Sequence, residues 1–302
     1  MDQKIRIPLR KALLKVTMRC NNSCSFCHAR SHAMVDDPSL EEVGNKILAA
    51  SKLGAEMVVF SGGEPTIRKD FPAIAKIMKS MGLPFGIVSN ARMLFYEDYF
   101  NDLAGSGLRY VLISLHGPNA EIHNSLTGSD SFDQTVTGLK RCVQAGISTT
   151  VNYVLTKGNL NCLNEMVDMV SSLPGVVLKL SFAETKGAAR EGFGEIVPDI
   201  SIAARKVMEA VEYSTSISDG RKIVLCDGFT PCLIDGFEKL NDDLFTHGFE
   251  WMSEVFEDGF YPVDHGARSR PEVCEECGKR AECPGVYSGY LELKGAGEFR
   301  PL

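Results

Sequence analysis

The sequence lacks several features that would fix the class of a protein at once. It has no apolar run near the roughly 20 residues that a membrane-spanning helix needs. The first ten residues carry charges but no apolar segment typical of a secretory signal, so we expect a cytosolic protein. Basic residues are not in excess: 32 Lys and Arg against 39 Asp and Glu give a net charge of −7. This balance argues against a general nucleic-acid binder.

The composition also lacks the bias of a disordered or fibrous chain. With 302 residues, 44% of them hydrophobic, the chain is long enough for two domains, or for one large α/β domain with an appendage. The charge is uneven, because residues 216–302 carry 17 acidic and 9 basic side chains, whereas the rest is nearly neutral. We therefore expect two domains, residues 1–215 and 216–302.

The ten cysteines are the unusual feature of a chain expected in a reducing compartment, where clustered thiols indicate metal binding or catalysis rather than disulfides. Two cysteines are isolated, Cys142 and Cys162, and we expect both to pack in the core. The other eight form two groups along the chain. They are Cys20, Cys24 and Cys27, and Cys226, Cys232, Cys274, Cys277 and Cys283.

Residues 11–182 repeat one pattern, in which a helical stretch ends at a glycine and a short apolar run follows. Glycine is a common residue just after a helix, and apolar runs without alternation suit parallel strands that are covered on both faces. The pattern predicts strands at Ala12–Met18, Met57–Ser61, Pro84–Ser89, Tyr110–Leu115, Thr149–Leu155 and Val176–Ser181. With right-handed crossovers, the expected fold is α/β, a partial (β/α)6 TIM-like barrel.

The repeat ends near residue 183, and the rest of the chain is expected to form a small hairpin and helix domain. Residues 184–198 are rich in glycine and are expected to form a loop, followed by a helix over Ile202–Tyr213. Lys222–Cys226 and Cys232–Ile234 flank a turn-rich segment and predict a hairpin. Residues 236–262 are expected to form helix and loop. The last thirty residues can bury little apolar surface, so a metal site would help them fold.

The first cysteine group has the spacing C-x3-C-x2-C directly after the first predicted strand. Three thiolates on one loop leave the fourth iron of a [4Fe–4S] cluster without a protein ligand. An open coordination position is typical of catalytic rather than structural metal sites. The alternative is a zinc knuckle with His28 or His32 as its fourth ligand.

This loop resembles the C-x3-C-x-Φ-C motif of the radical SAM superfamily, with Phe26 as the aromatic Φ. The resemblance implies that Cys20, Cys24 and Cys27 hold a [4Fe–4S] cluster with one open iron, which S-adenosylmethionine chelates. It implies reductive cleavage of S-adenosylmethionine to a 5′-deoxyadenosyl radical, which abstracts a substrate hydrogen. Phe26 would then lie beside the adenine.

Polar residues at later strand ends extend the resemblance in chain order. Gly62-Gly63-Glu64-Pro65 resembles the family's GGEP motif, whose position implies contact with the methionine amino group. Two glycines let the backbone approach a ligand closely, and a carboxylate suits an ammonium group. Other candidates for binding the cofactor are Ser89, Asn90, Ser114 and Asn152. Candidates on the substrate side are His116, Tyr153, Lys157 and Glu184, whereas His123 is expected on a helix surface.

The tail cysteines resemble the SPASM and twitch extensions of radical SAM enzymes, which hold auxiliary iron–sulfur clusters. The spacing C-x2-C-x5-C is followed by Tyr287 where the SPASM pattern has a fourth cysteine. Five thiols suffice for one auxiliary cluster but not for two. We favour Cys232, Cys274, Cys277 and Cys283 as ligands, with Cys226 the least certain, and structural zinc is the alternative. The acidic tail would make reduction of such a cluster harder.

The resemblance leaves the substrate open. The implied partners are S-adenosylmethionine, an electron donor such as flavodoxin or ferredoxin, and a substrate, with no nucleic acid or membrane among them. Only ten residues precede the first strand, so we expect no leader-binding domain. Oxidative modification of a peptide or protein is placed first. A radical dehydrogenase or cyclase acting on an alcohol, sugar or nucleotide is the second reading, and a zinc-stapled binding protein without radical chemistry is the third.

Overall fold

The computed structural model describes residues 10–29, 35–218, 223–241, 249–263 and 267–302. Among these residues, nine strands form one sheet in the order β7-β6-β5-β4-β3-β2-β1-β8-β9, and two more form a separate pair. The strands of the large sheet are β1 (Lys11–Thr17), β2 (Met57–Gly62), β3 (Phe85–Ser89), β4 (Leu108–Ser114), β5 (Ser148–Leu155), β6 (Val177–Phe182), β7 (Val224–Asp227), β8 (Phe249–Ser253) and β9 (Tyr261–Pro262).

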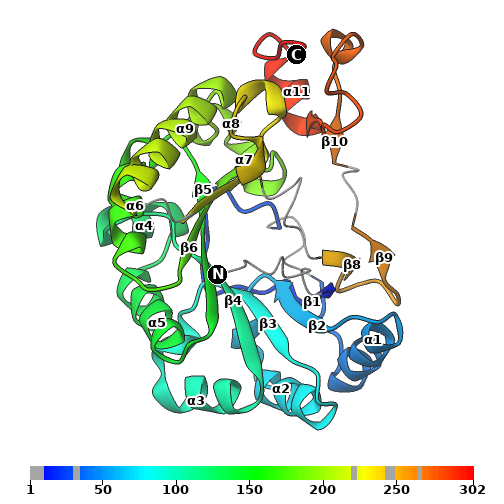
Figure 1. Cartoon of the computed structure of the whole chain (residues 1–302). Coiled ribbons are helices and arrows are strands. Elements are labelled where there is room, and N and C mark those ends of the chain that lie inside the picture. Colours follow the sequence, from blue (N-terminus) through cyan, green and yellow to red (C-terminus); the bar gives the residue numbers. More distant parts are fainter. Residues whose placement is uncertain (1–9, 30–34, 219–222, 242–248, 264–266) are drawn as a thin grey trace, which may run out of the picture.

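The six strands expected from the repeat are confirmed as β1 to β6, and each pairs in parallel with the next. The sheet is curved but does not close on itself in the described residues, as a partial barrel requires (Figure 1). The expected junction glycines, of which Gly54 and Gly146 are examples, all have positive φ. A left-handed residue lets the chain leave a helix and enter the next strand.

Helices cover the outer face of the curved sheet (Figure 1). Their inward faces carry aliphatic and aromatic side chains such as Ile47, Ile74 and Leu139, which are fully buried in one core with the strands. The helices of the repeat are α1 (Leu40–Lys52), α2 (Phe71–Ser80), α3 (Glu97–Gly105), α4 (Ala120–Thr127), α5 (Phe132–Gln144) and α6 (Leu163–Ser171). Burial on both faces explains why the strand sequences read as continuous apolar runs.

The expected hairpin after the barrel is wrong. β7 pairs in parallel with β6, and a 3-10 turn over Pro231–Leu233 follows it instead of a second strand. The apolar segment 223–226 resembles the other buried strands more than a hairpin arm, so the sheet simply continues.

The expected boundary at residues 215 and 216 does not divide the sheet either. β7 extends one edge, and β8, in a segment expected to be helix and loop, pairs in parallel with β1 at the other edge. A short antiparallel pair, β10 (Arg268–Ser269) with β11 (Val286–Tyr287), and helix α11 (Ser288–Lys294) do form the small hairpin and helix unit of the tail.

Residues 184–198 are not one loop, since they hold the short helices α7 (Gly187–Glu191) and α8 (Phe193–Ile196). The expected helix that follows is confirmed as α9 (Ile200–Ile217). The tail is fixed to the start of α9, because the hydroxyl of Tyr290 accepts a hydrogen bond from the Ile200 amide at 2.9 Å. Among the described residues, no helix has both the length and the apolar content to cross a membrane.

Candidate functional site

A cavity of about 500 Å³ opens at the carboxyl edge of the parallel sheet. Strands β2 to β7 each end at this edge, so side chains far apart in the sequence meet there. It is lined by the three cysteines of the first group and by all the expected cofactor-binding residues, which are Phe26, Gly62, Gly63, Glu64, Ser89, Asn90, Ser114 and Asn152.

The cysteine loop is held by neighbouring backbone rather than by its own secondary structure. The amides of Ser23 and Ser25 donate to the carbonyls of Thr127 and Leu126 at the end of α4, at 2.8 and 2.9 Å. Arg92 donates to the carbonyl of Asn21. Burial raises the pKa of Cys24 to about 12, so without bound iron the Cys24 side chain is a thiol, and its binding to a cluster must release a proton.

Gly62 and Gly63 are required by the strand before the cysteine loop. A Cβ on Gly62 would lie 1.9 Å from the carbonyl oxygen of Thr17, and one on Gly63 would lie 2.2 Å from that of Arg19. The Gly63 amide donates to the Thr17 carbonyl at 2.8 Å. The two glycines thus bring β2 against the start of the cysteine loop, a role that the sequence did not indicate.

The Glu64 carboxylate is fully buried and is already hydrogen-bonded within the protein. One oxygen, Oε1, accepts from the amide and hydroxyl of Thr66 and from the Ser89 hydroxyl at 2.9 Å, and the other, Oε2, accepts from the Asn90 amide at 2.6 Å. Burial raises the pKa of Glu64. Since a carboxylate oxygen has two lone pairs, Oε2 retains one for a ligand in the cavity, and Oε1 serves to fix the neighbouring strand ends.

The other polar candidates line the same edge. Asn90 donates from its amide nitrogen to the Asn21 side chain at 2.7 Å, which connects the end of β3 to the cysteine loop. Ser114 and Asn152 lie opposite each other in β4 and β5. The Asn152 side-chain oxygen accepts from the Ser181 hydroxyl at 2.7 Å. A continuous row of hydroxyl and amide groups therefore crosses four strand ends.

His116 lines the cavity as a neutral imidazole. The Val154 amide donates to its Nδ1 at 3.1 Å, so the ring proton is on Nε2. Burial, with a smaller effect of nearby His123, lowers the pKa of His116 to about 3. Its ring meets that of Phe26 edge-on, with centroids 4.6 Å apart. At neutral pH, His116 is therefore an uncharged imidazole with its proton on Nε2.

Two expectations about neighbouring side chains are wrong. His123 is fully buried instead of exposed, and its Nδ1 accepts from the His116 amide at 3.1 Å. Tyr153 does not line the cavity, because its side chain points into the core and its hydroxyl donates to the Asn159 carbonyl at 2.8 Å. Tyr153 is therefore withdrawn as a catalytic candidate.

Of the other two substrate-side candidates, Glu184 lines the cavity and Lys157 does not. Lys157 donates to the Gly194 carbonyl and is not among the lining residues. Glu184 does line the cavity and forms an ion pair with Lys186 at 2.7 Å. Burial acts to raise the pKa of Glu184, but the charge of His28 and the hydrogen bond and charge of Lys186 outweigh it, so the pKa lies below its ordinary value.

The sequence analysis missed some charged residues of the cavity wall. Lys15 lies within β1 and pairs with Glu254 at 2.5 Å. Asp227 ends β7 and pairs with Lys179 at 2.6 Å. Had residues 223–227 been interpreted as a seventh parallel strand, Asp227 would have been predicted at its carboxyl end.

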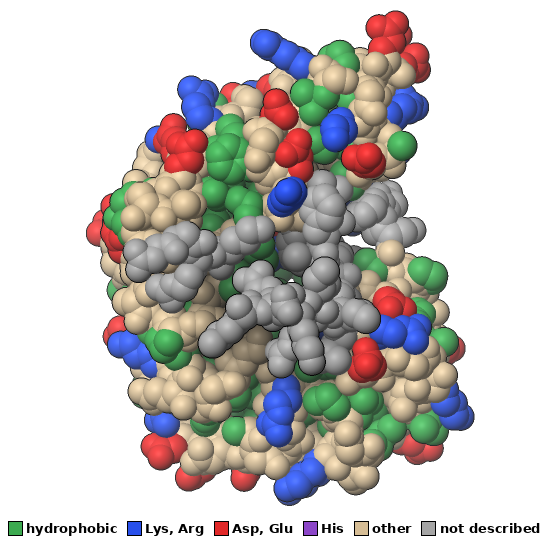
Figure 2. Space-filling model, viewed as in Figure 1, with side chains coloured by type: hydrophobic (Ala, Val, Ile, Leu, Met, Phe, Trp, Pro, Cys, Tyr) green, Lys and Arg blue, Asp and Glu red, His purple; other side chains and the backbone are tan. Residues whose placement is uncertain are grey.

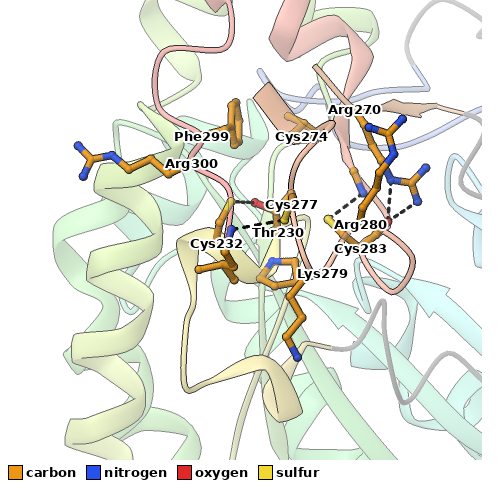
Figure 3. A pocket seen from close by; sticks show the side chains of 14 residues that line it. Thr230, Cys232, Arg270, Cys274, Cys277, Lys279, Arg280, Cys283, Phe299 and Arg300 are labelled. Carbon is orange, nitrogen blue, oxygen red and sulfur yellow. Dashed lines mark hydrogen bonds between the residues drawn. The ribbon is translucent and has the colours of Figure 1, made fainter. Parts of the chain in front are cut away.

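The tail forms a second, smaller cavity in which four cysteines meet. Cys232, Cys274, Cys277 and Cys283 all line it (Figure 3). Two of the sulfurs accept backbone hydrogen bonds, Cys283 from the Gly285 amide at 3.4 Å and Cys277 from the Leu302 amide at 3.5 Å. Cys232 contacts the Thr230 hydroxyl at 3.1 Å.

Cys226 does not belong to this group, which corrects its inclusion among the metal ligands. It lies in β7, is 1% exposed and packs in the main core. Of the two isolated cysteines, Cys142 is fully buried as expected, whereas Cys162 is only partly buried at the start of α6.

The thiols fit an iron–sulfur cluster better than a single ion. In the parts of the chain that the structure describes, no three or more His, Cys, Asp or Glu side chains converge closely enough to hold one metal ion. Zinc needs four ligands about 2.0–2.3 Å from its centre, whereas a cluster takes its four cysteines on separate irons and so accepts wider spacing. Of the two histidines considered as zinc ligands, His28 lines the cavity, and His32 lies outside the described residues.

Comparison with known proteins gives a family model described as "Radical SAM superfamily", which matches residues 14–170. One relative is "Probable GTP 3′,8-cyclase" of Thermococcus kodakarensis, 30% identical over 177 residues, 57% of this chain and 56% of that protein. Another is "Fe-coproporphyrin III synthase" of Methanosarcina barkeri, 29% identical over 51% of this chain and 39% of that protein. The chain thus spans little more than half the length of two such cyclases, since the match covers 56% of the first GTP 3′,8-cyclase and 58% of a second.

Solved structures share the fold over nearly the whole chain. Streptococcus suis SuiB bound to S-adenosylmethionine has a TM-score of 0.70 and 16% identity, covering 97% of this chain and 76% of SuiB. The protein anSMEcpe, with bound AdoMet and Cp18Cys peptide, has a TM-score of 0.67 and 14% identity, covering 96% of this chain and 92% of that chain. The likeness therefore includes the tail that follows the matched family region.

Proposed function

Since this chain belongs to the radical SAM superfamily, we propose that it is an oxidoreductase that cleaves S-adenosylmethionine reductively and removes a hydrogen atom from a peptide or protein substrate. The observation that carries this proposal is the meeting of the three-cysteine loop with Phe26, Glu64, Asn90 and Ser114 around one cavity. The proposed setting is the cytosol, where thiols stay reduced. A flavodoxin or ferredoxin is the proposed electron donor.

Two groups of cysteines would hold the cofactors. Cys20, Cys24 and Cys27 would hold the catalytic [4Fe–4S] cluster, and Cys232, Cys274, Cys277 and Cys283 would hold one auxiliary cluster in a SPASM- or twitch-like tail. When bound, the first cluster with S-adenosylmethionine supplies a 5′-deoxyadenosyl radical for hydrogen abstraction, and the second supplies a one-electron acceptor.

The chain's own residues bind and orient the cofactor along the strand ends. The free lone pair of Glu64 Oε2 is placed for a cationic group, and Ser114 and Asn152 offer polar groups farther along the row. Phe26 gives a flat apolar surface, and the edge of His116 packs against it. Holding these groups on strand ends keeps them at fixed positions before the ligand enters.

Glu184 is the proposed proton acceptor on the substrate side. It lines the cavity, and its lowered pKa keeps it ionised at neutral pH. An oxidation that removes a hydrogen atom and then an electron also releases a proton, which a positioned carboxylate can take. The Glu184 side chain is 27% exposed while it is paired with Lys186, and it lines the cavity, so it stays accessible to a substrate there.

The proposal of a peptide or protein substrate rests on two observations. The structural likeness to SuiB, which has also been solved bound to its precursor peptide SuiA, extends over 97% of this chain. Among the described lining residues, Lys15 supplies the only Lys or Arg side chain of the cavity, and Glu254 pairs with it. A triphosphate needs several basic contacts, so this wall does not favour a nucleotide.

A small-molecule substrate is the second candidate, because the curated relatives include proteins named as GTP 3′,8-cyclases. The two candidates differ in what should accelerate cofactor cleavage. A zinc-stapled binding protein is the alternative of another class.

The test begins with anaerobic purification, followed by iron, sulfide and zinc analysis. With dithionite and S-adenosylmethionine, the protein should release 5′-deoxyadenosine, Cys24→Ser should abolish that release, and Cys162→Ser should retain it because Cys162 lies outside both cavities. Peptides and GTP are then compared for their effect on the rate. A colourless protein that contains zinc and no sulfide would overturn the proposal.

A further inference from the structure

The charges around the tail cysteines are opposite to what the composition of the tail suggests. Residues 216–302 carry a net charge of −8, yet every charged side chain that lines the four-cysteine cavity is basic. These residues are Arg270, Lys279, Arg280 and Arg300. The acidic residues of the same segment, such as Glu275 and Glu276, do not line it.

Two of the four basic residues are tied to the cysteine segment by hydrogen bonds. Arg270 donates from Nε and Nη2 to the Cys283 carbonyl. Arg280 donates from its backbone amide to the Cys277 carbonyl at 3.1 Å and lines the cavity. Lys279 and Arg300, by contrast, extend away from the cysteines (Figure 3).

The first cavity has different surroundings. Its described lining residues include no arginine, its lysine is paired with Glu254, and the carboxylates of Glu64, Glu184 and Asp227 face it or lie in its wall. Over the face shown in Figure 2, acidic and basic side chains are interspersed. The difference between the two sites is therefore local, since it lies in the charged side chains that line each cavity.

A reduced iron–sulfur cluster carries one more negative charge than the oxidised one, and net charge and hydrogen bonds to sulfur set its potential. We propose that Arg270 and Arg280 stabilise the reduced auxiliary cluster and raise its reduction potential above that of the cluster at Cys20, Cys24 and Cys27. This inference rests on the two clusters of the proposed function. After hydrogen abstraction, the substrate radical loses one proton and one electron. The proton goes to a base, and the higher potential makes the auxiliary cluster the preferred acceptor of the electron.

The test is a redox titration of the anaerobic holoenzyme with dithionite, one electron per cluster, followed by electron paramagnetic resonance. Arg270→Gln and Arg280→Gln should each lower the auxiliary potential and leave the other cluster unchanged. Arg300→Gln removes the same charge from the same cavity wall but from a side chain that points away, so it should leave both potentials unchanged. Arg280→Lys, which keeps the positive charge, should retain most of the auxiliary potential that Arg280→Gln loses.

A second measurement uses the unaltered protein. Arg270 and Arg280 are exposed, so 1 M KCl should screen them and lower the auxiliary potential selectively. The proposal is overturned if the reduction potential of the auxiliary cluster lies below that of the catalytic cluster. It is also overturned if neither the arginine variants nor the added salt changes the auxiliary potential. Release of 5′-deoxyadenosine with unshifted potentials would refute only this inference, whereas a protein with two clusters but no release would refute the proposed function.

Discussion

His116 shows how one buried side chain can be chemically fixed by its hydrogen bonds. The Val154 amide occupies Nδ1, the His123 ring lies parallel with centroids 6.1 Å apart, and the residue is 2% exposed. A proton on Nδ1 would break the bond from Val154 and place a charge in the core. The chemistry left to His116 is therefore donation of a hydrogen bond from Nε2.

This predicts a pH dependence of stability. The pKa of His116 is about 3 in the folded protein and about 6.5 in an unfolded chain, so the unfolded state binds more protons between these values. The free energy of unfolding should fall as the pH drops below about 6.5, by up to about 1.4 kcal/mol per pH unit from this group. His116→Asn keeps an acceptor for Val154 but cannot titrate.

Urea unfolding of both proteins between pH 7 and pH 5 measures the effect. The variant should lose less stability over this range than the unaltered protein. Equal slopes would mean that His116 is not neutral in the folded state.

At the scale of single residues, the sequence predicted positions better than roles. The expected cofactor-binding residues all reach one cavity because each follows a parallel strand, and parallel strands end at a common edge. The buried histidine pair and the core position of Tyr153 were not predictable. Strand alternation alone does not reveal which side chains find partners across the sheet.

At the scale of elements, the six β/α units were predictable because glycine after each helix and an apolar run in each strand repeat in step. The strands at the sheet edges were not. β8 holds Trp251 and Ser253 in an acidic segment, and its pairing with β1 joins residues about 240 positions apart. Non-local pairing of this kind leaves little trace in the local pattern.

The contact between the end of β2 and the cysteine loop gives an element-scale prediction. In Gly63→Ala, the new Cβ would overlap the backbone of Met18 and Arg19, so β1 and β2 must separate where the loop begins. We expect a loss of about 1–3 kcal/mol in the free energy of unfolding and loss of iron from the first site alone.

Gly194→Ala is the matched control, since a Cβ there meets nothing within 4 Å. Urea unfolding and iron content should match those of the unaltered protein. If Gly63→Ala retained its stability and full iron content, the close approach would not be what positions the cysteine loop.

At the scale of the whole molecule, the tail is bound to the barrel by polar contacts with α9. Lys294 pairs with Asp199 at 2.6 Å, and Glu298 accepts from the Ser201 hydroxyl at 2.6 Å. Cys232 lies in the turn after β7, whereas Cys274, Cys277 and Cys283 lie in residues 267–302. The four-cysteine cavity can therefore form only when residues 267–302 are packed against the barrel, which couples ligand assembly to tertiary structure.

The last prediction tests this assembly with two neighbouring cysteines, of which the sequence favoured Cys232 as a ligand and left Cys226 the least certain. Cys226 and Cys232 are six positions apart, but one lies inside a buried strand and the other reaches the cavity. Cys232→Ser should lose the auxiliary cluster, seen as lower iron and sulfide, and should still cleave S-adenosylmethionine. Cys226→Ser should keep both clusters, with at most a lower unfolding temperature, because a hydroxyl in the core costs stability. Loss of the auxiliary cluster in Cys226→Ser at an unchanged unfolding temperature would instead make Cys226 a ligand, and the sheet edge would have to rearrange around it.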